Sequence, residues 1–149
     1  MKKLLHKIFK KKASDAGNNL AQIDDLQLAV GALLVEAARV DQDYTVLESS
    51  LIEASLKSMF DLSIDDAGRL LESAEAAQAD AVDLYRFTKI AKTLSLGEKR
   101  RLLESLWRII LSDNERDPHE NALVRRLCGL LYIPDIESNS ARQRVAAET

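Results

Sequence analysis

Residues 113–120 read DNERDPHE, and an earlier stretch, residues 41–48, reads DQDYTVLE. In both stretches an acidic residue stands at the first, third and eighth positions, and helical patterns of apolar residues lie on either side. The flanks repeat with the same offset of 72 residues, which pairs Leu34 with Leu106. An internal repeat of this kind predicts one domain built from two related helical halves, each with an acidic helix–loop–helix motif.

The composition is typical of a helical globular protein. The chain has 149 residues, of which 46% are hydrophobic and 30% are charged, enough for one domain with a buried core. Glycine (5) and proline (2) are scarce, whereas Ala, Leu, Glu, Lys and Arg are common. No stretch alternates as a strand would. We therefore predict an all-α fold, a single-domain bundle of about six to seven helices with two pseudo-repeated helix–loop–helix halves.

Cap signals divide the chain into helices. A Ser or Thr three residues before an acid predicts three helix starts, at Thr45/Glu48, Ser63/Asp66 and Ser95/Glu98. Asp80 is the predicted cap of a further short helix, and Asp117, followed by Pro118, that of another. With apolar spacings of three and four residues, these signals predict helices over approximately residues 20–40, 46–60, 64–76, 81–94, 96–110, 118–133 and 136–146.

Two single residues have predicted environments. Trp107 is expected to be partly buried, with its indole N–H near a polar rim. Cys128 falls on the apolar pattern of its helix and is expected to be a small buried hydrophobe rather than a nucleophile. A single cysteine excludes an internal disulfide, and no apolar run approaches the roughly 18 residues needed to span a bilayer. We therefore predict a cytoplasmic protein.

Charge divides the chain into two parts. Residues 1–12 carry six lysines and no acid, so the net charge of −3 leaves −9 on the rest. We expect residues 1–19 to form a basic N-terminal segment and linker, and residues 20–149 to form the helical domain. The apolar side of residues 1–12 favours weak contact with the inner face of an anionic membrane, and the alternative is a frayed, soluble start. The acidic body predicts no nucleic-acid binding.

The acidic motifs supply the candidate site. Helix capping explains why acids stand at positions Glu48, Asp117 and Glu120. It does not account for the acids that follow helix C-termini, where the helix dipole is negative and an extra anion costs roughly 0.3–1 kcal/mol. A bound cation would reverse the sign of that cost. The candidate metal ligands are therefore Asp41, Asp43, Glu48, Asp113, Glu115, Asp117 and Glu120.

The expected ligand is a divalent cation, namely calcium, magnesium or zinc. Asp113, Glu115 and Asp117 are spaced like the first acids of a calcium loop, but the closing acid stands at the eighth position and no glycine at the sixth, which excludes an EF-hand. His119 would add a nitrogen ligand and favour zinc. The alternative is an exposed histidine that has no such role.

These residues resemble the tellurite-resistance protein TerB family and its TerB-like relatives, over roughly residues 24–145. The resemblance is strongest from Ala38 to Glu48 and from Asp113 to Leu127. It implies an all-helical, bacterial, stress-associated module with two acidic motifs, which binds metal and docks to other proteins at the membrane. It also assigns the first motif to Asp41 and Glu48, and the second to Asp113 and Glu120.

The chain departs from the family at one point in each motif. Where the family often has glycine after the first Asp, this chain has Gln42 and Asn114. Asn tolerates a left-handed backbone conformation, whereas Gln adopts it poorly. The geometry of the first loop is therefore expected to be the less favourable of the two.

Three functions remain open at this point. The favoured one is a non-enzymatic stress-response module whose acidic motifs bind a divalent cation or a basic protein partner. The second is a metal-dependent hydrolase that uses the same carboxylates, which requires the two loops to converge within about 10 Å. The third is a purely structural helical scaffold with solubilising acids.

Overall fold

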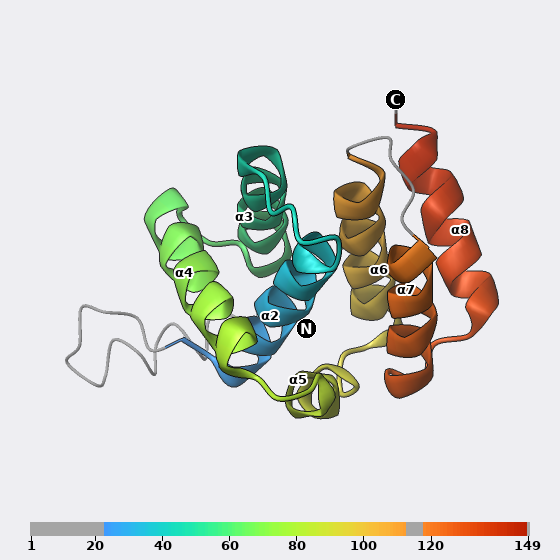
Figure 1. Cartoon of the computed structure of the whole chain (residues 1–149), viewed down its shortest axis with the longest axis horizontal. Coiled ribbons are helices and arrows are strands. Elements are labelled where there is room, and N and C mark those ends of the chain that lie inside the picture. The colour runs from blue at the N-terminus through green and yellow to red at the C-terminus, as the bar shows by residue number, and fades with distance from the viewer. Residues whose placement is uncertain (1–22, 113–117, 149) are drawn as a thin grey trace.

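The computed structural model describes residues 23–112 and 118–148, and within these ranges it contains seven helices and no strand. Figure 1 shows their arrangement, and none of them is long and apolar enough to cross a bilayer. The prediction of an all-α fold is confirmed, and the division into two pseudo-repeated halves stays a prediction. The helices are α2 (Asp25–Arg39), α3 (Val46–Phe60), α4 (Ile64–Asp80), α5 (Tyr85–Ala91), α6 (Leu96–Leu111), α7 (Pro118–Leu130) and α8 (Asp135–Ala146).

Helix α2 is the central element. Every residue from Ala29 to Val35 is buried, because this stretch has small or apolar side chains on all sides of the helix. It contacts α3, α4, α5 and α6. In Figure 1, α3 and α4 lie on one side of it and α6, α7 and α8 on the other. The position of α2 therefore determines where the loop that follows it is held.

Helices α2 and α4 approach each other closely at Gly31. A Cβ atom on this residue would lie 2.8 Å from the Cβ of Ala74, which is shorter than a normal contact. The absence of a side chain at Gly31 and the small one of Ala74 therefore set the spacing of the helices. A larger residue at position 31 would push α4 away from α2, and with it the partners of the loop after α2.

The predicted caps of α3, α4 and α6 are confirmed. Thr45 and Ser95 each accept a hydrogen bond from a backbone N–H three residues on, and the acids at those positions, Glu48 and Glu98, accept one in return. Ser63 caps α4 in the same way, but the carboxylate of Asp66 instead lies 3.6 Å from the guanidinium of Arg69. Only two of the three predicted caps are therefore reciprocal.

The prediction for the end of α4 was wrong. This helix continues from the predicted end at Ala76 to Asp80, because the intervening alanines favour helix. Asp80 is consequently the last residue of α4 and does not cap the next helix. That helix begins after Leu84 without a side-chain cap, and just before it the Oδ1 of Asp83 accepts a hydrogen bond from the N–H of Tyr85 at 2.9 Å.

Helix α7 has the apolar side that the sequence predicts. It begins at Pro118, and its buried residues are Glu120, Leu123, Val124, Leu127 and Cys128. Burial raises the pKa of the Cys128 thiol, so the protonated form is favoured. The prediction of a small buried hydrophobe at this position is confirmed. The predicted cap of α7, Asp117, lies outside the described residues.

Helix α8 covers Trp107, which is therefore more deeply buried than predicted. The indole is 5% exposed, and its Nε1–H donates to Ser138 Oγ at 3.2 Å. The guanidinium carbon of Arg142 lies 5.4 Å from the ring centroid. The polar rim expected near the indole is thus a single hydroxyl of α8.

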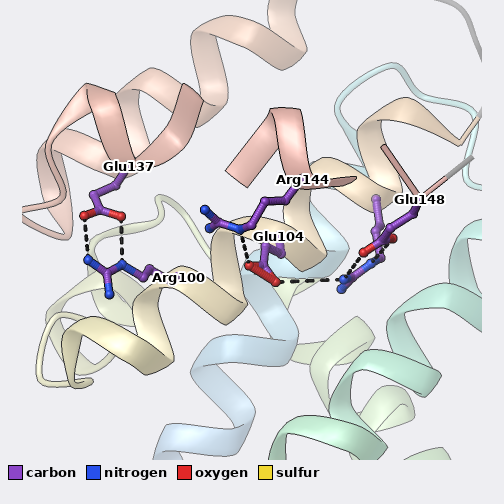
Figure 2. Close-up of polar contacts among 6 residues, drawn as sticks. Arg100, Glu104, Glu137, Arg144 and Glu148 are labelled. Atoms are coloured by element: carbon purple, nitrogen blue, oxygen red, sulfur yellow. Dashed lines mark hydrogen bonds and ion pairs between the residues drawn. The ribbon is translucent and has the colours of Figure 1, made fainter. Parts of the chain in front are cut away.

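Arginine–carboxylate pairs join α6 to α8 and to the residues just after it (Figure 2). Arg100 pairs with Glu137 at 2.8 Å, and Arg108 with Glu148 at 2.7 Å, both through two hydrogen bonds. A third pair, between Arg144 and Glu104, has a nitrogen–oxygen distance of 2.9 Å. The pairing lowers the pKa of Glu137 and of Glu148. Because these pairs are exposed, each stabilises the helix contact only slightly.

Candidate functional site

The first acidic loop, residues 40–45, joins α2 to α3. The Asp41 Oδ1 accepts a hydrogen bond from the Asp43 N–H at 3.0 Å, a side-chain turn that replaces a backbone one. Between these two residues, Gln42 has a φ of 66°. This is the position at which the family resemblance places a glycine. The loop thus needs the left-handed conformation, and the chain adopts it with a residue that disfavours it.

A polar network fixes this loop to α4. The Tyr44 hydroxyl donates to Glu75 Oε2 at 2.6 Å. Arg39 donates to the Glu75 carbonyl at 3.1 Å and to Gln78 Oε1 at 2.6 Å, and its guanidinium carbon lies 4.9 Å from the Tyr44 ring centroid. Gln78 in turn donates to Glu36 at 3.0 Å. The entrance and the middle of the loop are therefore both tied to the same helix.

Burial is the main cause of a raised pKa at Tyr44, and the hydrogen bond to Glu75 adds to it. The tyrosine therefore stays protonated and donates to Glu75 throughout the neutral pH range. No spacing in the sequence predicts this pair, because 31 residues separate its members. The sequence feature that could have indicated this pair is an aromatic residue inside an otherwise acidic loop.

Glu48 is one of the seven predicted ligands, and the structure shows it in a capping role. Its side chain is 2% exposed, and Oε1 accepts from the Thr45 N–H at 2.9 Å and lies 3.1 Å from the Thr45 hydroxyl. Glu120 occupies the equivalent position of the second motif and is also 2% exposed. The closing acids of both motifs are thus buried, unlike the acids at the first and third positions of the first motif.

Asp41 and Asp43 are the acids of this loop that reach solvent. Asp43 is exposed and Asp41 is partly exposed. Neither forms an ion pair with any residue in the described ranges. Because the nearby cation Arg39 is directed towards α4, two negative charges remain at the C-terminal end of α2.

The complete ligand set remains a prediction. Among residues 23–112 and 118–148, no three His, Cys, Asp or Glu side chains are grouped so that they would hold a metal ion. Asp113, Glu115 and Asp117 lie outside these ranges. The convergence of the two loops that the hydrolase hypothesis requires therefore also stays a prediction. His119 is exposed in the first turn of α7, and its role as a ligand also stays a prediction.

These features define an all-helical protein whose first acidic loop is fastened between its central helix and α4. The family described as Tellurite resistance protein TerB matches residues 27–143, and the chain belongs to this family. The resemblance inferred from the acidic motifs is thereby confirmed. Searches among curated proteins and among solved structures gave no match.

Proposed function

We propose that this TerB-family protein is a non-enzymatic, tellurite-resistance-like binding module whose first acidic loop binds a positively charged ligand. The ligand is a divalent cation or the basic surface of a protein partner. One observation supports the proposal above all. The carboxylates of Asp41 and Asp43 reach solvent from a loop whose neighbouring side chains, Arg39 and Tyr44, are fixed to α4.

The electrostatics of the loop favour a cationic ligand. Both carboxylates follow the C-terminus of α2, where the partial charge of the helix is negative and each additional anion costs roughly 0.3–1 kcal/mol. A positive ligand would make the same field favourable. Since Asp41 is also held by its hydrogen bond to Asp43, little ordering is left for binding to impose.

The two kinds of ligand make different demands on the chain. Calcium takes six to eight oxygen ligands, and Asp41 and Asp43 provide only part of such a set. The cation version of the proposal therefore requires Asp113, Glu115 and Asp117 as further ligands. A basic protein surface requires only that Asp41 and Asp43 are accessible. Substitution in either motif thus distinguishes the two versions.

Calorimetric titration of the full chain tests the proposal. The probes are calcium, magnesium, manganese, zinc and a lysine-rich peptide. We expect heat of binding with at least one of them, and a melting temperature that rises with its concentration. The double variant Asp41→Asn/Asp43→Asn keeps the side-chain oxygen that accepts from residue 43, removes both charges and should lose this binding.

The matched control is Glu72→Gln/Asp80→Asn. It removes two exposed acids from α4, one of them at the C-terminal end of that helix, and so changes the net charge equally. We expect it to bind as the unmodified chain does. Absence of heat with every ion and with the peptide would overturn the proposal. Equal loss in both double variants would reduce it to an effect of net charge.

We further propose that the protein works in the cytoplasm. Residues 1–12, with their six lysines, would then contact the inner face of the membrane weakly and bring the module near partners there. Fractionation of cells that express the full chain checks this. When these lysines are replaced by glutamine, the share of the protein in the membrane fraction should fall.

A further inference from the structure

We propose that a second surface of this protein, formed by α5 and the start of α6, binds an anionic lipid membrane. We call this surface the basic face and define it by the cations Arg86, Lys89, Lys92 and Lys99. It is distinct from the first acidic loop and from residues 1–12. The proposal rests on the charges, the exposure and the arrangement of these residues.

The charge of this region is opposite to that of the chain as a whole. Residues 85–101 contain six cations and one acid, in a protein with a net charge of −3. Two of the six make polar contacts within the fold, since Arg100 pairs with Glu137 (Figure 2) and Arg101 donates to the Ser58 carbonyl. The four cations of the basic face have no carboxylate within 4.0 Å among the described residues.

The packing of α5 directs two of these cations outward. Phe87, Thr88 and Ala91 are buried on its inner side, and the helix contacts α2 and α7. Arg86 and Lys89 are exposed on its outer side. Figure 1 shows α5 at the lower edge of the molecule, where a flat surface can reach it. The face is therefore accessible without any rearrangement of the fold.

The turn between α7 and α8 extends the same surface. The Nζ atom of Lys92, just after α5, lies 5.8 Å from the ring centroid of Tyr132 in that turn. The tyrosine itself is 74% exposed. Residues far apart in the sequence thus bring one cation and one aromatic ring together.

Large exposed apolar side chains neighbour the cations along the sequence. Val82 is fully exposed, Tyr85 is 59% exposed and Leu96 is also exposed. These residues precede α5, begin it and begin α6, respectively. Basic side chains with interspersed apolar and aromatic ones are typical of surfaces that lie in a membrane interface, where the rings enter the headgroup region and the cations contact lipid phosphates.

A lipid surface fits this area better than the other anionic partners. Three of its four cations are lysines, which act as flexible point charges and lack the planar geometry with which arginine pairs to a particular carboxylate. Nucleic acid is disfavoured because the net charge of the chain is negative. A membrane rich in acidic lipids requires only a dense negative charge and an apolar layer beneath it.

Vesicle sedimentation with the full chain tests the inference. The vesicles are phosphatidylcholine alone and phosphatidylcholine with about a third phosphatidylserine, a proportion that gives a strongly negative surface. We compare the unmodified chain with Arg86→Gln/Lys89→Gln. Each basic residue near such a surface strengthens binding about fivefold, so the partition coefficient on the acidic vesicles should fall about thirtyfold.

The matched control is Lys57→Gln/Arg69→Gln, which removes two exposed cations from α3 and α4. Its partitioning should fall less than threefold, since these residues lie outside the basic face. Any contribution of residues 1–12 is common to all three proteins. Equal partitioning of both double variants would overturn the inference. So would binding of the basic face to polyglutamate with none to the acidic vesicles, which would assign it to an acidic protein partner.

Discussion

The first acidic loop and the basic face are both strongly charged, but their charges have different partners. In the loop, Arg39, Tyr44 and Glu48 are all bonded within the fold, and only Asp41 and Asp43 reach solvent without an ion pair among the described residues. On the basic face, Arg86 and Lys89 are exposed on a short helix, and Lys92 and Lys99 are partly exposed. The comparison distinguishes charged side chains that stabilise the fold, such as Arg39 and Glu48, from those that are available to a ligand, such as Asp41, Asp43 and the cations of the basic face. Substitutions should therefore divide into those that change stability and those that change binding.

The largest expected effect is that of Glu48→Ala. This change removes the acceptor of the Thr45 N–H from a buried site, so the free energy of unfolding should fall by about 2 kcal/mol. Urea denaturation measures it. Glu48→Gln retains an acceptor and should lose less than half as much. If both variants were as stable as the unmodified chain, Glu48 would belong with the solvent-facing acids.

Tyr44→Phe should have the next largest effect. Loss of the hydrogen bond to Glu75 should lower the free energy of unfolding by about 1 kcal/mol at neutral pH. Because the pKa of Tyr44 is raised from 10.0, its contribution is present below pH 10 and is lost as the pH rises above that value. Unfolding curves at pH 7 and at pH 11 check this. A stability difference between the two proteins that did not shrink in alkali would contradict the assignment.

Position 42 tests the backbone of the loop. Gln42→Gly should be more stable than Gln42→Ala by about 1 kcal/mol, because only glycine adopts the left-handed conformation at no steric cost. Neither variant alters a side chain of the polar network, so both should bind the ligand of the loop. Thermal denaturation of the pair measures the difference. An alanine variant as stable as the glycine one would mean that the loop does not require φ = 66°.

The smallest effect is expected at the margin of the basic face, where Arg100 is paired with Glu137. The pKa of Glu137 is lowered from 4.5, so the pair contributes above pH 4.5 and is lost as the pH falls below that value. Trp107, the single tryptophan, reports on α8 through its contact with Ser138. Its fluorescence should change in acid before the far-ultraviolet circular dichroism does. Glu137→Gln should remove part of that early change, whereas Glu72→Gln should not.

The parts of the fold that the sequence predicts are those with local causes. Thr45 with Glu48 and Ser95 with Glu98 lie within one helical turn, so their caps were correctly predicted. The end of α4 was missed because its alanine-rich last turns carry no stop signal, and Asp80, the last residue of α4, was therefore assigned as the cap of the next helix. The depth of Trp107 depends on Ser138, 31 residues away.

The same distinction applies to the candidate site. The sequence identifies the acids of the first motif, and their position after α2 follows from the helical pattern. It assigns Glu48 both to a helix cap and to the ligand set, and the structure shows that this carboxylate is buried whereas that of Asp43 is exposed. The contacts of Arg39 and Tyr44 with α4 arise only when the two helices pack together. The basic face was likewise hidden, because the net charge of the whole chain is negative.

The most direct test of the central claim is an NMR titration of the full chain, in which the amide signals are followed residue by residue. Calcium, magnesium, zinc and then a lysine-rich peptide are added in turn. We predict that at least one of them shifts the amides of residues 41–44 most strongly, and that Asp41→Asn/Asp43→Asn abolishes these shifts while the remaining spectrum stays that of the folded protein. Unchanged signals at residues 41–44 with every probe would contradict the claim that this loop binds a positive ligand.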